Sequence, residues 1–199
     1  MEAAFDEESL LAKVRPLGVK QRLAFLLAIA ERMKGNYLAF KKETKAGDLK
    51  ALEDALTSGW RFVAGGEVHE KAIETGIERC EGAAPDSEEH DTLLLSPALD
   101  AASCAGLVLE LVRDNDPELV VDGASLARDT IDRYITEKDD LDPSDARFEE
   151  RILEHARMQA ELKKQREDVE SLEKQEMDEQ GVADLERRWR APKKSNLGL

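Results

Sequence analysis

The sequence predicts an all-α fold, a multi-helix bundle of about seven helices with a long C-terminal helix. Apolar residues recur at steps of three and four along most of the 199 residues, which is the spacing of one face of a helix. No segment alternates apolar and polar residues between turn signals, as a strand of a hairpin would. Because the apolar residues fall in periodic blocks, we expect a folded chain despite its 37% of charged residues.

Three helical segments are expected in the first half of the bundle. Residues 21–44 form a strongly apolar run, which predicts two packed helices joined at Lys34-Gly35-Asn36. A helix over residues 48–63 is opened by Asp48 and stopped by the glycines that follow it. Another helix covers about residues 68–79.

Three dipeptides mark further helix starts, because a short polar residue caps the first turn and a following proline presets its backbone. They are Ser96-Pro97, Asp116-Pro117 and Asp142-Pro143. The helix over residues 97–113 is apolar around most of its circumference, which predicts a central position in the bundle. The helix after Asp116 keeps its apolar residues on one face and ends near Thr136.

A long polar helix is expected over residues 142–180, because no glycine or proline follows Pro143 in this segment. Unbroken, it would be roughly 57 Å long at a rise of 1.5 Å per residue. Its sparse apolar positions leave two interpretations, a solvated helix with a frayed end or a narrow seam for self-association. The whole chain, 1–199, is then a single all-α domain with a bundle core at 1–136 and a basic irregular tail at 186–199.

The charge of the chain bears on its partners. Its net charge is −15, from 29 lysines and arginines against 44 aspartates and glutamates. Such a surface repels phosphate backbones and anionic lipids, so we expect no nucleic-acid partner and no membrane partner. The same field favours a basic protein partner, and the long polar helix could instead form a homo-oligomer.

Two further features favour a cytoplasmic location. The N-terminal MEAAFDEES has neither the basic nor the apolar region of a secretory signal. The apolar stretch over residues 96–112 contains Asp100 and Glu110 and is shorter than the roughly 20 residues of a membrane span.

No motif predicts a cofactor, a metal or a catalytic residue. Cys80 and Cys104 form no Cys-x-x-Cys pair, and no Glu-x-x-His motif of a di-iron bundle is present. His90 lies among Ser87, Glu88, Glu89 and Asp91 in an expected loop, without the ligand spacing of a defined metal site.

Three blocks carry a resemblance to a known family: residues 24–40, residues 96–111 and the closing SNLGL. On these blocks the chain resembles the YjaG-like family of small bacterial proteins, which carries a domain of unknown function. The resemblance implies a helical fold and supplies no catalytic residues. Its recurrent positions are candidates for shared structure first and for a shared interaction surface second. They are Glu31, Arg32, Asn36, Tyr37 and Asp100.

Two functional hypotheses follow. We favour a non-enzymatic interaction or adaptor protein, including an immunity-type protein that blocks a basic partner. The alternative is a small-ligand binder or enzyme with a pocket around Asp100, Tyr37 and Arg32. We also expect Arg32 and Asp100 to form a buried ion pair, because each lies in a strongly apolar segment and neither charge is stable there alone.

Overall fold

The computed structural model describes residues 6–190 and 192–199, and over these residues the protein has nine α-helices and no strand. The all-α prediction is therefore confirmed, with more helices than the seven expected. The bounds are α1 Glu7–Val14, α2 Val19–Thr44, α3 Leu49–Val63, α4 Glu70–Ala83, α5 Leu95–Asp114, α6 Glu118–Lys138, α7 Phe148–Glu154, α8 Ala156–Leu172 and α9 Glu179–Trp189. Part of the N-terminal segment used to predict location, residues 1–5, lies outside the described residues.

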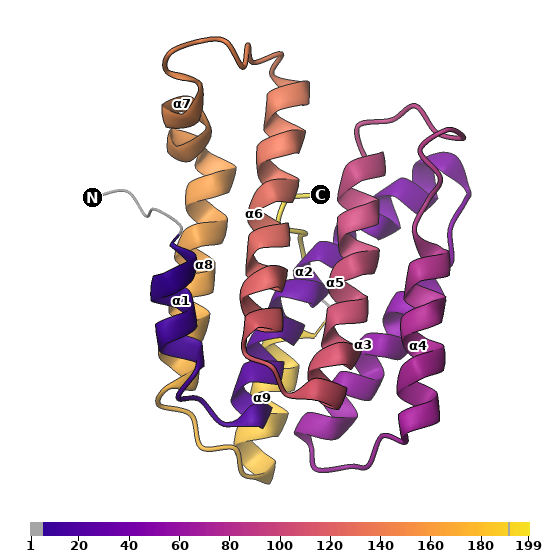
Figure 1. The fold of residues 1–199 in the computed structure, drawn as a ribbon, viewed down its shortest axis with the longest axis vertical. Coiled ribbons are helices and arrows are strands. Elements are labelled where there is room, and N and C mark those ends of the chain that lie inside the picture. The colour runs from indigo at the N-terminus through magenta and orange to yellow at the C-terminus, as the bar shows by residue number, and fades with distance from the viewer. Residues whose placement is uncertain (1–5, 191) are drawn as a thin grey trace.

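Two helices, α2 and α5, form the centre of the bundle. Helix α5 packs against α2, α3, α4 and α6, while α2 also contacts α8 and α9, and Figure 1 shows the other helices arranged around this pair. Among the described helices, α5 is long and apolar enough to cross a membrane, but 61% of that stretch is buried inside the bundle. A core helix has this composition, because most of its circumference faces other helices.

Of the four helix starts predicted from local capping, those at Asp48 and Asp116 are correct. Helix α5 begins at Leu95, before the predicted Ser96-Pro97, and no side chain caps it. The Asp48 carboxylate accepts a hydrogen bond from the Ala51 amide at 3.3 Å and caps α3. The Asp116 carboxylate accepts one from the Glu118 amide at 3.0 Å where α6 begins. The start at Asp142-Pro143 is wrong, because α7 begins only at Phe148 after a turn.

Helix α2 is continuous through Gly35, so the predicted division of residues 21–44 into two helices is wrong. Two of the three residues taken for a turn, Gly35 and Asn36, instead contact the C-terminal tail. A Cβ atom on Gly35 would lie 2.7 Å from the Ser195 Cβ, and the Asn36 side chain donates a hydrogen bond to the Asn196 side chain at 2.7 Å. A glycine inside a helix costs about 1 kcal/mol, and here it permits a close approach of the two segments.

The expected long helix over residues 142–180 is divided among α7, α8 and the start of α9. The first break is at His155, whose extended backbone lets its ring accept a hydrogen bond from the Arg157 amide at 3.2 Å and cap α8. The second break follows Leu172, whose carbonyl accepts a hydrogen bond from the Gln21 side chain at 2.7 Å. The chain turns back there, and Val182 and Leu185 of α9 also reach the core.

The segment expected to be solvated is therefore packed. Gln165, Asp168, Val169 and Leu172 of α8 are all buried, so no frayed end and no free apolar seam remains there. Residues 186–189 of the expected irregular tail belong to α9, and Trp189 is buried.

The last residues are tied to the bundle. The Ser195 hydroxyl accepts hydrogen bonds from the amides of Leu197 and Leu199, each at 3.2 Å. Leu197 is fully buried, and its carbonyl accepts a hydrogen bond from Arg157 at 2.9 Å. The closing SNLGL is thus part of the folded core.

We predict that Gly35→Ala destabilises the protein by about 1–3 kcal/mol, because the added methyl group overpacks the contact with Ser195. The matched control is Gly82→Ala in α4, where nothing lies within 4 Å of an added Cβ atom, so helix propensity should stabilise it by up to about 1 kcal/mol. Urea unfolding measures both changes. Equal stabilisation by the two substitutions would show that the tail does not contact α2.

Candidate functional site

Four of the five residues singled out from the sequence lie on α2 and the fifth, Asp100, lies on α5, and each contacts a different neighbour. The Glu31 carboxylate accepts hydrogen bonds from the Trp60 indole at 3.1 Å and from the Lys34 ammonium at 2.6 Å. Glu31 is 1% exposed, and these contacts compensate its charge while they join α2 to α3.

Arg32 forms a buried ionic cluster with two acids of α8. Its guanidinium donates to both oxygens of Glu161, at 3.2 and 2.8 Å, and to Asp168 at 2.9 Å. Gln165 adds a hydrogen bond to Glu161 at 3.0 Å, and Lys164 pairs with Asp168. The expected ion pair between Arg32 and Asp100 is wrong, because α8 supplies the carboxylates instead.

Arg32 and Glu161 each stabilise the charged form of the other. Burial alone would raise the pKa of Glu161, but the charge and hydrogen bonds of Arg32, with help from Gln165, hold that pKa below its ordinary value. Burial alone would lower the pKa of Arg32, whereas Glu161 and Asp168 together raise it. The guanidinium of Arg32 is thus bonded to two buried carboxylates, and Lys164 reaches Asp168 from a partly exposed position; buried charges persist when they are paired in this way.

The remaining sequence-predicted residues also join helices. Asp100 of α5 accepts hydrogen bonds from Thr130 at 2.7 Å and Arg133 at 2.6 Å, both on α6. Burial raises the pKa of Asp100, although Thr130 and Arg133 act to lower it. The Tyr37 hydroxyl donates to the Ala83 carbonyl at 2.5 Å, at the end of α4, and burial raises the pKa of Tyr37. The polar ends of Asp100, Tyr37 and Arg32 thus reach separate partners.

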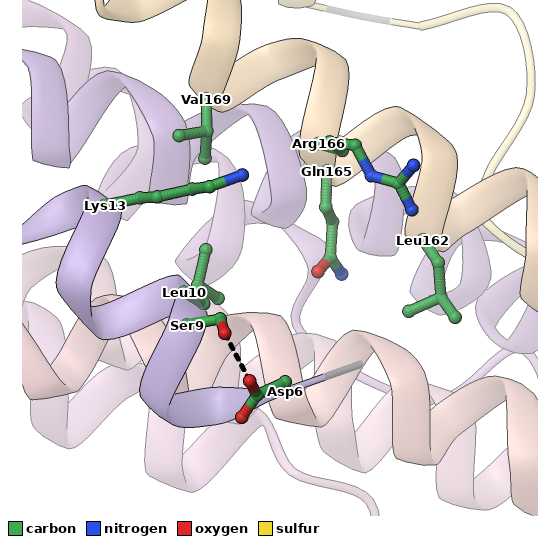
Figure 2. Close-up of a pocket in the computed structure, with 8 residues that line it drawn as sticks. All are labelled: Asp6, Ser9, Leu10, Lys13, Leu162, Gln165, Arg166 and Val169. Atoms are coloured by element: carbon green, nitrogen blue, oxygen red, sulfur yellow. Dashed lines mark hydrogen bonds between the residues drawn. The ribbon is translucent and has the colours of Figure 1, made fainter. Parts of the chain in front are cut away.

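One small pocket lies beside the ionic cluster, between α1 and α8. Figure 2 shows side chains from both helices around it, with the Ser9 hydroxyl bonded to Asp6. The lining residues are Asp6, Ser9, Leu10, Lys13, Leu162, Gln165, Arg166 and Val169. Its volume is about 180 Å³, below the roughly 300 Å³ at which small-molecule sites begin.

A larger groove with a strongly acidic wall lies among α1, α4, α5 and α6, and its volume is about 460 Å³. Its apolar or small lining residues are Ile77, Cys80, Ala84, Ala102, Gly106, Leu107 and Leu126, with Ser103 and Ser125 between them. Its acidic residues are Glu7, Glu81, Glu110, Asp122 and Asp129. No lysine or arginine is found among its described lining residues. We call it the acidic groove.

Asp122 and Glu7 of the acidic groove repel each other, whereas Asp129 is paired with Arg128. Burial raises the pKa of Asp122, and the charges of Glu118, Glu7 and Asp116 raise it further. Glu7 accepts a hydrogen bond from the Ser125 hydroxyl at 3.0 Å, which joins α1 to α6 at the wall. A positive group bound in the groove would relieve this repulsion, because an opposite charge stabilises ionised carboxylates. In the sequence, Asp122 and Asp129 could only be placed on the polar face of their helix.

Residues suited to metal binding or thiol chemistry are few. Within residues 6–190 and 192–199, no group of three or more His, Cys, Asp or Glu side chains could hold a metal ion. His90 packs edge-on against the Phe40 ring, with the ring centroids 5.1 Å apart. Both cysteines are free and buried, and burial raises the pKa of Cys80 to about 11 and that of Cys104 to about 12. At neutral pH these thiols stay protonated and unreactive.

The sequence matches a protein family over residues 9–199, and that family is described as a protein of unknown function (DUF416). The chain belongs to the DUF416 family. The family relationship expected from the three sequence blocks is thus confirmed at the level of a domain of unknown function, while the YjaG-like label stays a prediction.

A crystal structure of a DUF416 family protein from Shewanella baltica OS155, solved at 1.91 Å resolution, has the same fold. The two proteins are 23% identical and superpose with a TM-score of 0.84, over 95% of this chain and 97% of the other. At this identity the similarity shows the fold alone. No curated protein matches the sequence.

We predict that Arg32→Ala destabilises the protein by about 3–5 kcal/mol, because it leaves Glu161 and Asp168 buried without their main cation. The matched control is Arg133→Ala, which should cost less because its side chain is 53% exposed. Urea unfolding at pH 7 compares the two. A cost for Arg32→Ala no larger than that for Arg133→Ala would contradict the role of the cluster.

The cluster also predicts a pH dependence of stability. Because the pKa of Glu161 is lowered in the folded protein, its contribution is full above the unfolded value of 4.5 and is lost as the pH falls toward the folded pKa. The unfolding free energy of the wild type should thus fall more between pH 6 and about 3.5 than that of Glu161→Gln. Parallel pH profiles for the two proteins would rule this out.

Proposed function

We propose that this protein is a non-enzymatic interaction protein of the cytoplasm, an adaptor or an immunity-type protein, and that its acidic groove binds a basic amphipathic segment of a protein partner. The observation that carries the proposal is the groove itself, in which five carboxylates surround a floor of small and apolar residues. An amphipathic helix binds by placing its apolar face in such a groove, while its lysines and arginines meet the acidic wall.

The electrostatics of the groove support a basic occupant. The charged residues among its described lining are all acids, one of which, Asp129, is paired with Arg128, and the net charge of the protein is −15. Such a field steers basic partners toward the surface and repels acidic ones, so it contributes to specificity and to the rate of association. An immunity-type protein that blocks a basic target is one form of this proposal.

The alternative, an enzyme or ligand site around Asp100, Tyr37 and Arg32, has no supporting geometry. Each of these side chains is engaged with residues of another helix, as the hydrogen bonds to Thr130, Ala83 and Glu161 show. A binding site needs polar groups that converge on one cavity, whereas these three fasten helices together.

Nucleic acid remains an unfavourable partner in this proposal. Two arginines of the basic C-terminal region are paired with acids of their own helix, Arg187 with Asp184 and Arg190 with Glu186. Cations that are already paired contribute little to phosphate binding. The net negative charge of the protein also repels phosphate groups. The buried free cysteines suit the reducing cytoplasm.

We predict that a synthetic amphipathic helical peptide, with lysines on one face and leucines on the other, binds the wild-type protein in the groove. The triple variant Glu81→Gln, Glu110→Gln and Asp122→Asn should bind it about tenfold more weakly, since three wall charges at about 0.5 kcal/mol each are removed. Fluorescence anisotropy measures the affinities, and higher salt should weaken the wild-type complex.

The matched control removes three acidic charges away from the groove, in the variant Glu88→Gln, Glu89→Gln and Glu170→Gln, all at exposed positions. It has the same net charge as the groove variant and should bind within about twofold of the wild type, because screened charges at a distance contribute little. Equal weakening in both variants would mean that the peptide senses only the overall charge, and the groove proposal would fail.

A further inference from the structure

A second pocket, with lysine-rich walls, lies where the C-terminal tail crosses α2. Its volume is about 370 Å³, within the range of small-molecule sites. Helix α2 contributes residues 31, 34, 35, 38, 39 and 42, which share one face; α3 contributes Leu49 and Glu53, and the tail contributes residues 192–195 and Leu199. We call it the lysine pocket, and it shares no lining residue with the acidic groove.

The walls of the lysine pocket include an unusual apolar surface. Among the described residues, only three large hydrophobic side chains are exposed, and two of them line this pocket: Leu38, 38% exposed, and Leu199, 44% exposed. Ala39, Leu49 and Pro192 extend the same surface. Apolar surface gathered in a concave site gains free energy when a ligand removes it from water.

The charges of the lysine pocket have the opposite sign to those of the protein as a whole. Four lysines, Lys34, Lys42, Lys193 and Lys194, line it against the two acids Glu31 and Glu53. Glu31 is already compensated by Lys34 and Trp60. Within the described residues, the ammonium groups of Lys42, Lys193 and Lys194 take part in no ion pair, so they remain available to an anion.

We propose that the lysine pocket binds a small amphipathic anion, an organic molecule whose apolar body lies against Leu38, Leu49 and Leu199 while a carboxylate or phosphate head group meets the exposed lysines. Both halves of the ligand are required. The apolar surface would bind the apolar body of the ligand. The surplus of lysines, on a protein of net charge −15, would bind its anionic head group. The bound molecule would also hold the C-terminal tail against α2.

Isothermal titration calorimetry with four probes tests the chemistry of the ligand. We expect octanoate or octyl phosphate to bind at one molecule per chain, and the preference between them identifies the head group. Octylammonium, which has the same chain and the opposite charge, should not bind, and inorganic phosphate alone should not bind either. Binding of neither amphipathic anion, or equal binding of octylammonium, would overturn the proposal.

Two variants test whether the ligand binds in the lysine pocket. Lys193→Gln with Lys194→Gln should weaken binding of the amphipathic anion about tenfold, which corresponds to about 1.4 kcal/mol, while Ala39→Phe should abolish it by filling the cavity. The matched control is Lys163→Gln with Lys174→Gln, which removes two exposed lysines of α8 and the turn after it and should leave the affinity unchanged. The circular dichroism of each variant verifies its fold.

An unchanged affinity in the Lys193→Gln and Lys194→Gln variant would overturn the proposal even if Ala39→Phe failed to fold, because both lysines are exposed tail residues. If the Lys193→Gln and Lys194→Gln variant and the control variant lost the same affinity, the effect would be one of general charge, and the proposal would be overturned too. The groove variant described above shares no residue with this pocket, so the two proposals succeed or fail independently.

Discussion

The guanidinium of Arg32 lies in the middle of the most extensively buried helix and meets two carboxylates of α8 there. A buried cation without a partner would cost several kcal/mol, so α8 has to lie where Glu161 and Asp168 reach it. That requirement fixes the part of the chain from α8 onward. With α8 in place, α9 returns along α2 and the tail reaches Gly35 and Asn36. The closing residues pack where they do because one ionic contact has already set the path of the preceding helices.

The net charge is a sum over the whole chain, and the fold gathers the acidic and the basic side chains on different surfaces. The acidic groove gathers carboxylates from four helices, whereas the lysine pocket gathers cations from α2 and from the tail. Residues far apart in the sequence, such as Lys34 and Lys194, come to line one cavity. This protein therefore presents one concave surface of acidic and apolar residues and another of lysines and apolar residues.

Helix capping and apolar periodicity correctly predicted the helices that are determined by residues close together in the sequence. Asp48 caps α3 because its carboxylate is within reach of the Ala51 amide three residues on, and the apolar circumference of α5 required a central position. A structural role for the five candidate positions could be expected, but their partners could not. Arg32 and Asp100 looked like a pair because both lay in apolar segments, and nothing in the spacing of the sequence distinguished Asp100 from Glu161 or Asp168.

The sequence by itself determined the helical class, most of the helix starts in the first two thirds and the buried central helix, because capping and apolar periodicity act over one or two turns. Only the tertiary structure decided that Gly35 continues a helix and that His155 and the residues after Leu172 interrupt one. The physical reason is that these choices are set by contacts between distant segments. The tail fills the space beside Gly35, and the Gln21 side chain binds the carbonyl of Leu172 at the last turn of α8.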